Sequence, residues 1–281
     1  MTPEAFEVRP FPRARADLVD ALEVGVRRHV VHALLELDVT AARERLRTAE
    51  GERLSFTAFL VASLARAIDG DRLLHAYRDL WGRLVLFEEV DVVTLVEAER
   101  GGVAIPHVLR AANRRPVREL HDELRRVQAT PRSSAQRSGA LARLSRFVPG
   151  VLRRLFFRLL RRSPGLMKRT AGTTLVTSVG MFGPGGGWAI GILPLHTLGL
   201  TVGAVTARPW AVEGRVEVRE ILPVTLSVDH DLVDGAPAAR FARRFREIVE
   251  GAEVLSEAKS VSAREHLFPS PPAQRGERDQ G

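Results

Sequence analysis

The sequence predicts a fold of the α/β class, in which helices pack on a buried sheet. Residues 221–228 form a run of apolar and β-branched side chains after a polar segment, as expected of a largely buried strand. Residues 237–249 follow with apolar side chains at helical intervals and arginines between them. The chain has 281 residues, 45% of them hydrophobic, so it can bury a substantial core in one large domain.

The connection between these two elements contains the main candidate site. His230 follows the predicted strand, and Asp234 and Gly235 provide a turn before the helix, because aspartate and glycine favour turn conformations. An imidazole has an ordinary pKa of about 6.5, so a histidine held here can take a proton from a thiol or hydroxyl near neutral pH. The alternative is a histidine that only makes a structural hydrogen bond at a strand end.

The composition excludes several other kinds of chemistry. The chain has no cysteine, which leaves no disulfide, no thiol nucleophile and no Cys-based metal site. It also lacks the Gly-x-Ser-x-Gly elbow of hydrolases, a phosphate-binding loop and a nucleic-acid motif. His29 and His32 have no carboxylate cluster at ligand spacing, so we expect no metal. The first residues are acidic, without the apolar stretch of a signal peptide, which favours a cytoplasmic location.

The motif His230-x-x-x-Asp234-Gly235 resembles the signature of the catalytic domain of the 2-oxo acid dehydrogenase dihydrolipoyl acyltransferases, which the chloramphenicol acetyltransferases share. Other segments look like that family and keep its order. They are a core helix at residues 54–68 capped by Ser55 or Thr57, strands at 89–96 and 102–109, a helix at 116–127 and a glycine-rich strand and loop at 172–183. The resemblance covers residues 10–252.

The resemblance implies roles for individual residues. His230 would be the general base, and Asp234 would order its loop by pairing with an arginine, for which Arg27 and Arg28 are the candidates. Thr177 aligns with the family's serine, and either Thr177 or Ser178 would stabilise the oxyanion; the alternative for both is an ordinary hydroxyl on a strand. Asp231 departs from the family, whose dehydrogenase members usually have an arginine after the histidine.

The resemblance also implies a fold and an activity. The fold would be a chloramphenicol acetyltransferase-like two-layer sandwich, with a mixed sheet covered by helices, assembled as a homotrimer or larger oligomer with sites between subunits. The activity would be transfer of an acyl group between coenzyme A and a dihydrolipoyl-type thiol, with the lipoyl or other carrier supplied by another chain. The alternatives are a stand-alone O-acetyltransferase of a small hydroxyl compound and a non-catalytic trimeric scaffold or membrane-associated relative.

A basic segment distinguishes the chain from the family's pattern. No Asp or Glu occurs between Glu123 and Glu213, and residues 149–163 within this stretch predict an amphipathic helix. Its apolar face would contain Val151, Leu152, Leu155, Phe156, Leu159 and Leu160, opposite Arg153, Arg154, Arg158, Arg161 and Arg162. The helix could cover the protein's own core with its arginines in solvent, contact an anionic membrane surface, or bind an acidic partner such as the phosphates of CoA or a carrier protein.

The expected organisation is a single catalytic domain at residues 1–255. The basic helical segment would be an insert at residues 137–170. Residues 256–281 lose apolar periodicity and end in a proline-rich and charged run, which predicts a disordered tail.

Overall fold

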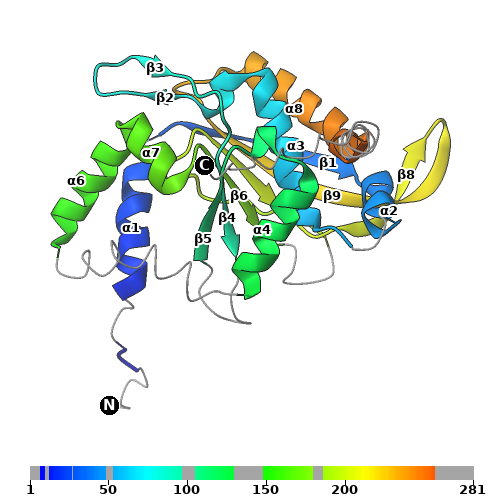
Figure 1. Ribbon diagram of the computed structural model, residues 1–281, viewed down its shortest axis with the longest axis horizontal. Coiled ribbons are helices and arrows are strands. Elements are labelled where there is room, and N and C mark those ends of the chain that lie inside the picture. Colours follow the sequence, from blue (N-terminus) through cyan, green and yellow to red (C-terminus); the bar gives the residue numbers. More distant parts are fainter. Residues whose placement is uncertain are drawn as a thin grey trace, which may run out of the picture.

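The computed structural model describes residues 7–9, 13–26, 28–48, 53–96, 105–129, 148–179 and 186–256. In this part of the chain, helices pack on a mixed seven-stranded sheet, as predicted (Figure 1). The helices are α1 (Arg13–Gly25), α2 (Thr40–Thr48), α3 (Phe56–Gly70), α4 (Val117–Ala129), α6 (Gly150–Arg161), α7 (Pro164–Ala171) and α8 (Gly235–Glu250), with short 3-10 turns at Arg72–His75 and Ala112–Arg114.

The strands of the main sheet are ordered β1-β9-β7-β6-β4-β5. Their bounds are β1 Val30–Asp38, β4 Val92–Val96, β5 Ile105–Leu109, β6 Thr174–Ser178, β7 Leu198–Val202 and β9 Arg215–Asp229. β6 runs parallel to both of its neighbours, and the other pairs on this path are antiparallel. β8 (Thr206–Val212) pairs with the first half of β9, and β2 (Tyr77–Arg78) pairs with β3 (Leu84–Val85) in a separate hairpin.

The main core lies between one face of the sheet and helices α3, α4 and α8 (Figure 1). Side chains alternate between the two faces of a strand, so every second residue of β9 points into this core. Leu222, Val224, Leu226 and Val228 are buried there against α3 and α8. The hydroxyl of Ser55 caps α3 by accepting a hydrogen bond from the backbone N–H of Ala58, which confirms one of the two predicted caps.

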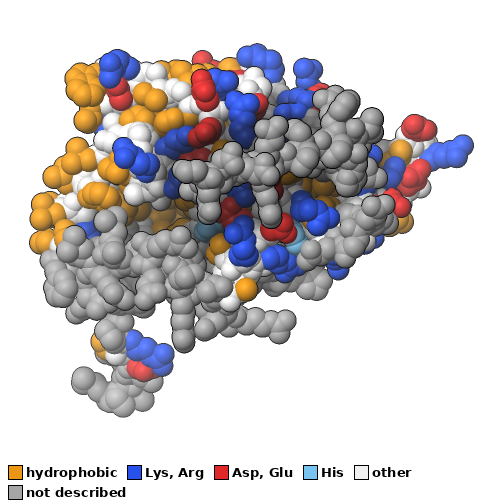
Figure 2. Space-filling view, viewed as in Figure 1, with side chains coloured by type: hydrophobic (Ala, Val, Ile, Leu, Met, Phe, Trp, Pro, Cys, Tyr) orange, Lys and Arg blue, Asp and Glu red, His pale blue; other side chains and the backbone are white. Residues whose placement is uncertain are grey.

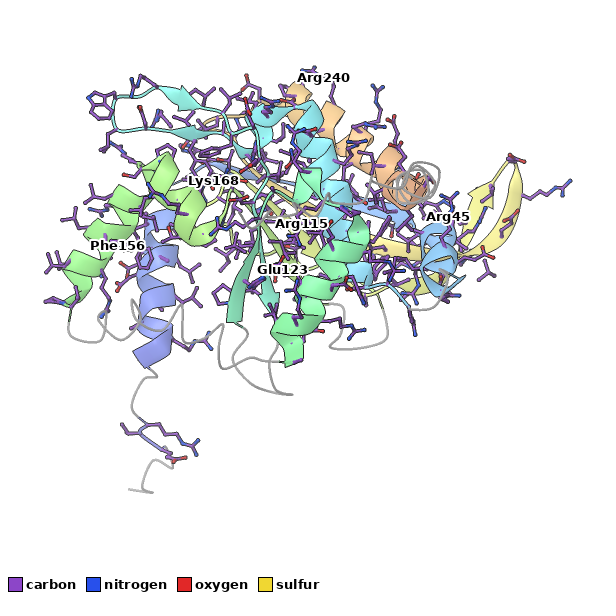
Figure 3. All side chains as sticks on the ribbon, viewed as in Figure 1. Arg45, Arg115, Glu123, Phe156, Lys168 and Arg240 are labelled. Carbon is purple, nitrogen blue, oxygen red and sulfur yellow. The ribbon has the colours of Figure 1, made fainter. Side chains whose placement is uncertain are left out.

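The contact between α4 and β5 is polar. Glu123 on α4 binds His107 of β5 at 2.7 Å and Arg115 at 2.7 Å; Figure 3 labels Arg115 and Glu123 on this side of the sheet. The hydrogen bond from His107, followed by Arg115, lowers the pKa of Glu123 to about 2. The predicted helix at 116–127 is therefore held against the sheet by this charged contact as well as by its apolar face.

The opposite face of the sheet is exposed on its outer strands, whereas Thr201 and Thr225 at its centre are buried. The residues that alternate with the core positions, including Thr177, Thr201 and Thr225, point to this face. The segment 188–195 crosses it, and the backbone N–H of Gly191 donates to the Thr201 hydroxyl at 3.1 Å. Several large apolar side chains remain exposed on or beside this face, namely Leu34, Leu95, Ile190 and Ile192.

The predicted amphipathic helix at 149–163 is present as α6, but the first of its three alternatives, with arginines in solvent over an apolar inner face, is wrong for Arg153 and Arg154. Arg153 and Arg154 point inward to α1, where they bind Asp20 at 2.7 Å and Glu23 at 3.0 Å. Leu155 and Phe156 face outward, with 47% and 38% of their surface exposed. Of the apolar residues, Leu160 is buried and Phe157 half-buried, in a small cluster with Tyr77, Met167 and Leu195. The carboxylates of α1 therefore orient α6.

Two predicted features lie mainly outside the described residues. The structure describes Ser256 but not residues 257–281 of the expected tail, and the insert expected at 137–170 is described only from residue 148. Within the described residues, no helix is long and apolar enough to cross a membrane.

Candidate functional site

His230 lies where the buried strand β9 reaches the surface. Val228 and Asp229 are buried, whereas the His230 side chain is exposed. The backbone N–H of His230 donates to the carbonyl of His29 at 2.8 Å, and that of Asp229 donates to the carbonyl of Thr197 at 2.9 Å. The backbone on both sides of the histidine is thus fixed, as a proton-transferring side chain requires. No side-chain partner is described for the imidazole among the placed residues.

A buried ion pair holds the end of β9 in place. Arg28 donates to Asp229 at 3.0 Å, and the two side chains are only 3% and 6% exposed. Arg28 also donates to the backbone carbonyls of His196, at 2.6 Å, and Leu193. Removing one member of a buried pair leaves an uncompensated charge, so this contact holds the loop before β1, the segment before β7 and the end of β9 together.

Asp234 is not the partner of this arginine. Arg28 pairs with Asp229 and not with Asp234. The other candidate, Arg27, lies outside the described residues. Asp234 is exposed at the N-cap position of α8 without a side-chain capping bond. Its negative charge still stabilises the start of the helix, where the backbone dipole is positive.

The residue after the histidine makes a second polar contact at the strand end. Asp231 binds Nδ1 of His29 at 2.7 Å, and this hydrogen bond raises the pKa of His29. The backbone N–H of Asp231 donates to Asp229 at 3.2 Å. Asp231 therefore turns toward the loop before β1.

Thr177 and Ser178 lie at the opposite end of the sheet from His230. Thr177 is aligned with Thr201 of β7, which is aligned with Thr225 of β9. His230 comes five residues after Thr225, and at about 3.3 Å per residue this separates the two positions by about 17 Å along the strands. A base and an oxyanion donor must both lie within about 3 Å of the reacting atoms, so one chain does not bring these groups into one site.

The hydroxyl end of the sheet is partly accessible. Thr177 is half-buried and Ser178 is exposed. Gly191 passes directly over this region, and a Cβ atom there would collide with the Thr201 hydroxyl and lie 3.4 Å from the Thr177 methyl group. Of the predicted glycine-rich strand and loop, residues 172–179 are described; Gly186 and Gly187, which come shortly after it, both have positive φ angles.

Two other histidines are buried in the protein away from solvent. Burial lowers the pKa of His75 to about 4, and burial likewise lowers the pKa of His196 to about 4. His75 bonds the Thr173 hydroxyl at 3.0 Å, and Nε2 of His196 lies 2.8 Å from the carbonyl of Ala171. These two histidines are neutral structural groups at neutral pH.

Charged groups near the strand end could hold an anionic ligand. A small pocket beside the turn after β9 is lined by residues that include Arg28, Arg78, Arg161 and Arg162. No group of three or more His, Asp or Glu side chains that could hold a metal occurs within the described ranges. Sequence reasoning missed Asp229 and Arg161, although a carboxylate at the end of a buried strand is a signal that a cation lies nearby.

Comparison with known proteins finds a family similarity in the C-terminal part of the chain. Residues 162–256 match the model of the 2-oxoacid dehydrogenases acyltransferase (catalytic domain), a range that includes Thr177, Ser178, His230 and Asp234. The dihydrolipoyllysine-residue acetyltransferase component of the pyruvate dehydrogenase complex of Zymomonas mobilis is 26% identical over 184 residues, which are 66% of this chain and 32% of the relative. The chain thus spans about a third of that relative's length.

Solved structures agree on the fold. A probable dihydrolipoamide acetyltransferase from Listeria monocytogenes superposes with a TM-score of 0.64 at 18% identity, covering 88% of this chain and 95% of the other. A chloramphenicol acetyltransferase superposes with a TM-score of 0.51 at 14% identity, covering 90% and 99%. The predicted chloramphenicol acetyltransferase-like fold is therefore confirmed. Residues 162–256 of this chain are therefore similar in sequence to the catalytic domain of the 2-oxoacid dehydrogenase acyltransferases.

Proposed function

We propose that this protein transfers an acyl group between coenzyme A and a dihydrolipoyl-type thiol, with His230 as the general base. The observation that carries the proposal is His230 itself, exposed at the end of a rigid buried strand within the matched residues 162–256. Dihydrolipoyl acyl transfer is the activity named for the relative from Zymomonas mobilis. Coenzyme A is a substrate here, and the acceptor thiol belongs to a lipoyl group.

The imidazole drives the reaction by moving one proton. His230 takes the proton from the acceptor thiol, and the resulting sulfur attacks the carbonyl carbon of the acyl-CoA thioester. The oxygen of the tetrahedral intermediate becomes an anion, and a hydroxyl donor at this oxygen is worth on the order of 3 kcal/mol. The bond to the CoA sulfur then breaks, and the imidazolium returns the proton to the departing CoA thiolate.

The Arg28–Asp229 pair keeps the base in place. Because both side chains are buried, the strand end and the preceding loop move together. Asp234 is assigned to the start of α8, where its charge orders the turn that follows the histidine. The family resemblance gives both roles to Asp234 alone. In this chain we assign the pairing with arginine to Asp229 and the ordering of the turn to Asp234.

We further propose that each complete site lies between two copies of the chain, in a homotrimer or a larger oligomer. The oxyanion donor, Thr177 or Ser178, lies about 17 Å along the sheet from His230 of the same chain, so a neighbouring copy must bring it to the base. The sheet face that carries Thr177 also exposes large apolar side chains, as subunit interfaces do before assembly.

The first experiment measures CoA release from several acyl-CoAs with dihydrolipoamide and with simple hydroxyl acceptors. We expect turnover with the thiol, and a fall of about 100-fold or more in His230→Ala. The control is His32→Gln, which removes an exposed imidazole from β1 and keeps a hydrogen-bonding group for Ser227. Faster turnover of a hydroxyl acceptor would select the O-acetyltransferase alternative. No turnover with any acceptor, in the parent as in His230→Ala, would select the non-catalytic scaffold.

Mixing two inactive variants tests the shared site. His230→Ala lacks the base, and a Thr177→Ala/Ser178→Ala double variant lacks the donors. Random mixing gives about a quarter of interfaces with an intact base and an intact donor from different copies. We expect activity to return when equal amounts are co-expressed. Two inactive variants that stay inactive in mixed oligomers would contradict a site shared between copies.

We also propose that α6 contacts an anionic membrane surface in the cytoplasm. Its outward residues Val151, Leu152, Leu155, Phe156 and Leu159 form, with Leu80 of the β2–β3 turn, what we call the α6 apolar surface. Figure 2 shows hydrophobic side chains gathered on this side of the molecule. The neighbouring sequence contains no acidic residue from 124 to 212, which suits anionic lipid headgroups.

Cosedimentation with vesicles containing phosphatidylserine tests this contact. We expect binding by the parent protein and loss of binding in Leu155→Ser/Phe156→Ser, with vesicles of phosphatidylcholine alone as a control for charge. Parent and variant that both fail to sediment would contradict the membrane contact. A simultaneous change in the mass of the oligomer would instead place the α6 apolar surface between copies of the chain.

A further inference from the structure

A cationic pocket lies beside the strand end that carries His230, and the mechanism above uses only its Arg28–Asp229 pair. We call it the arginine pocket and define it by six charged side chains, Arg28, Arg78, Arg161, Arg162, Asp229 and Asp231. They come from the loop before β1, from β2, from the end of α6 and from the end of β9 with its following turn. Folding therefore brings together four cations from three separate segments of the chain.

The two carboxylates do not neutralise the four guanidinium groups. Asp229 is already bonded to Arg28 at 3.0 Å, and Asp231 is bonded to His29 at 2.7 Å. In the described parts of the chain, no carboxylate lies within salt-bridge distance of Arg78, Arg161 or Arg162. The pocket therefore carries an excess of positive charge.

Two hydrogen-bond donors in the pocket are buried and unpartnered. They are Nε of Arg28 and Nη1 of Arg161. Burial, followed by the positive charge of Arg28, lowers the pKa of Arg161, and the nearby Asp229 and Asp231 only partly oppose this. A buried cation with an unsatisfied donor is costly unless an anion accepts from it. An oxyanion with two or more oxygens would supply the missing acceptors.

We propose that the arginine pocket binds an oxyanion carried by the acyl-CoA substrate, with Arg161 and Arg162 as its main ligands. This inference rests on the proposed acyltransferase function. Such a substrate has two sources of the same chemistry: a carboxylate at the far end of a dicarboxylic acyl chain, and the phosphates of CoA. Guanidinium groups bind both with paired hydrogen bonds. Asp229 and Asp231 of the pocket flank His230 in the sequence, so the pocket lies beside the end of β9 that carries the base.

Kinetics with two substrates distinguish the sources. The test variant is Arg161→Gln/Arg162→Gln, and the matched control is Arg158→Gln, an exposed arginine of α6 outside the pocket. Binding of an acyl carboxylate predicts a KM at least about 10-fold higher for succinyl-CoA and unchanged for acetyl-CoA. Binding of CoA phosphate predicts the same increase for both substrates. Unchanged KM values for both substrates in the double variant would overturn the proposal.

Direct binding decides the question without turnover. Succinate and pyrophosphate are titrated into the parent, the double variant and the Arg158→Gln control by calorimetry, with circular dichroism to confirm folding. We expect the parent and the control to bind at least one anion about 10-fold more tightly than the double variant does. A parent that turns over no acyl-CoA but shows this difference would contradict the proposed function and support the pocket. Equal titrations of parent and double variant would overturn the pocket.

Discussion

Helices α8 and α6 have the same kind of sequence and opposite orientations. Both combine apolar residues at helical spacing with several arginines. In α8 the apolar residues Phe241, Phe245 and Ile248 are buried in the core, and Arg240 and Arg243 are exposed. In α6 Arg153 and Arg154 are bound to α1, and Leu155 and Phe156 are exposed; Figure 3 labels Arg240 on α8 and Phe156 on α6.

The two helices differ in the surface that each one packs against. α8 packs on a sheet face where β9 supplies only apolar side chains, so burying its arginines there would cost far more than burying its phenylalanines. α6 packs on α1, where Asp20 is 4% exposed and needs a cation. The partner surface therefore determines which face of the helix lies inward.

The largest expected effect is on the side of α8. Phe245→Ala removes a fully buried ring from the main core and should lower the free energy of unfolding by about 3–5 kcal/mol. Phe156→Ala removes the same side chain from the outer face of α6 and should change it by about 0.5 kcal/mol or less. Urea denaturation of both variants measures the contrast, and similar losses would mean that the α6 apolar surface is covered in solution.

Acid should weaken the region around α7 before the α8 core. The pKa values of His75 and His196 lie near 4 in the folded protein, below the ordinary 6.5. The unfolded chain therefore binds more protons between pH 6.5 and 4, and the stabilisation present above pH 6.5 is lost as the pH falls through this range. At pH 5 the loss is about 2 kcal/mol for each histidine.

Hydrogen exchange at pH 7 and pH 5, corrected for the intrinsic rate, measures where protection is lost. We expect a larger decrease in α7 than in α8, because Ala171 of α7 contacts His196. The control is His75→Gln, whose stability should depend less on pH than that of the parent. A uniform decrease across both helices would contradict a separate, acid-sensitive region.

The ion pair between α1 and α6 should have a moderate effect. Asp20→Asn removes the charge that binds Arg153 while keeping the shape of the side chain, and it should cost about 1–2 kcal/mol. The matched control is Glu23→Gln, an exposed partner of Arg154, which should cost about 0.5 kcal/mol or less. Thermal unfolding of the two variants compares them. Equal, small effects would remove Asp20 as the cause of the inverted orientation.

The smallest expected change in stability comes from the outer face of α6. Leu155→Ser should leave the free energy of unfolding within about 0.5 kcal/mol of the parent, because the side chain is about half exposed. The same substitution in α8, Ile248→Ser, exposes the core to a polar group and serves as the contrasting control. A cost for Leu155→Ser comparable with that of Ile248→Ser would show that α6 packs more deeply than its exposure indicates.

These helices also show what the sequence could predict. The elements were predictable because local signals define them: Ser55 caps α3, and the buried run at 221–228 becomes the core half of β9. The orientation of α6 was not predictable, because it depends on a contact with Asp20, which is distant in the sequence. His230 was found from its motif, whereas its support by Arg28 and Asp229 depends on a contact between residues about two hundred positions apart.

The separation of Thr177 from His230 has a consequence for how the protein responds to concentration. Each chain folds with both groups present, yet about 17 Å of sheet lies between them. With the proposed site shared between copies, dilution below the dissociation constant of the oligomer would therefore abolish the acyltransferase activity while leaving every chain folded. Activity would then report how much of the protein is assembled, and synthesis of more chain would raise the activity per chain as well as the number of chains.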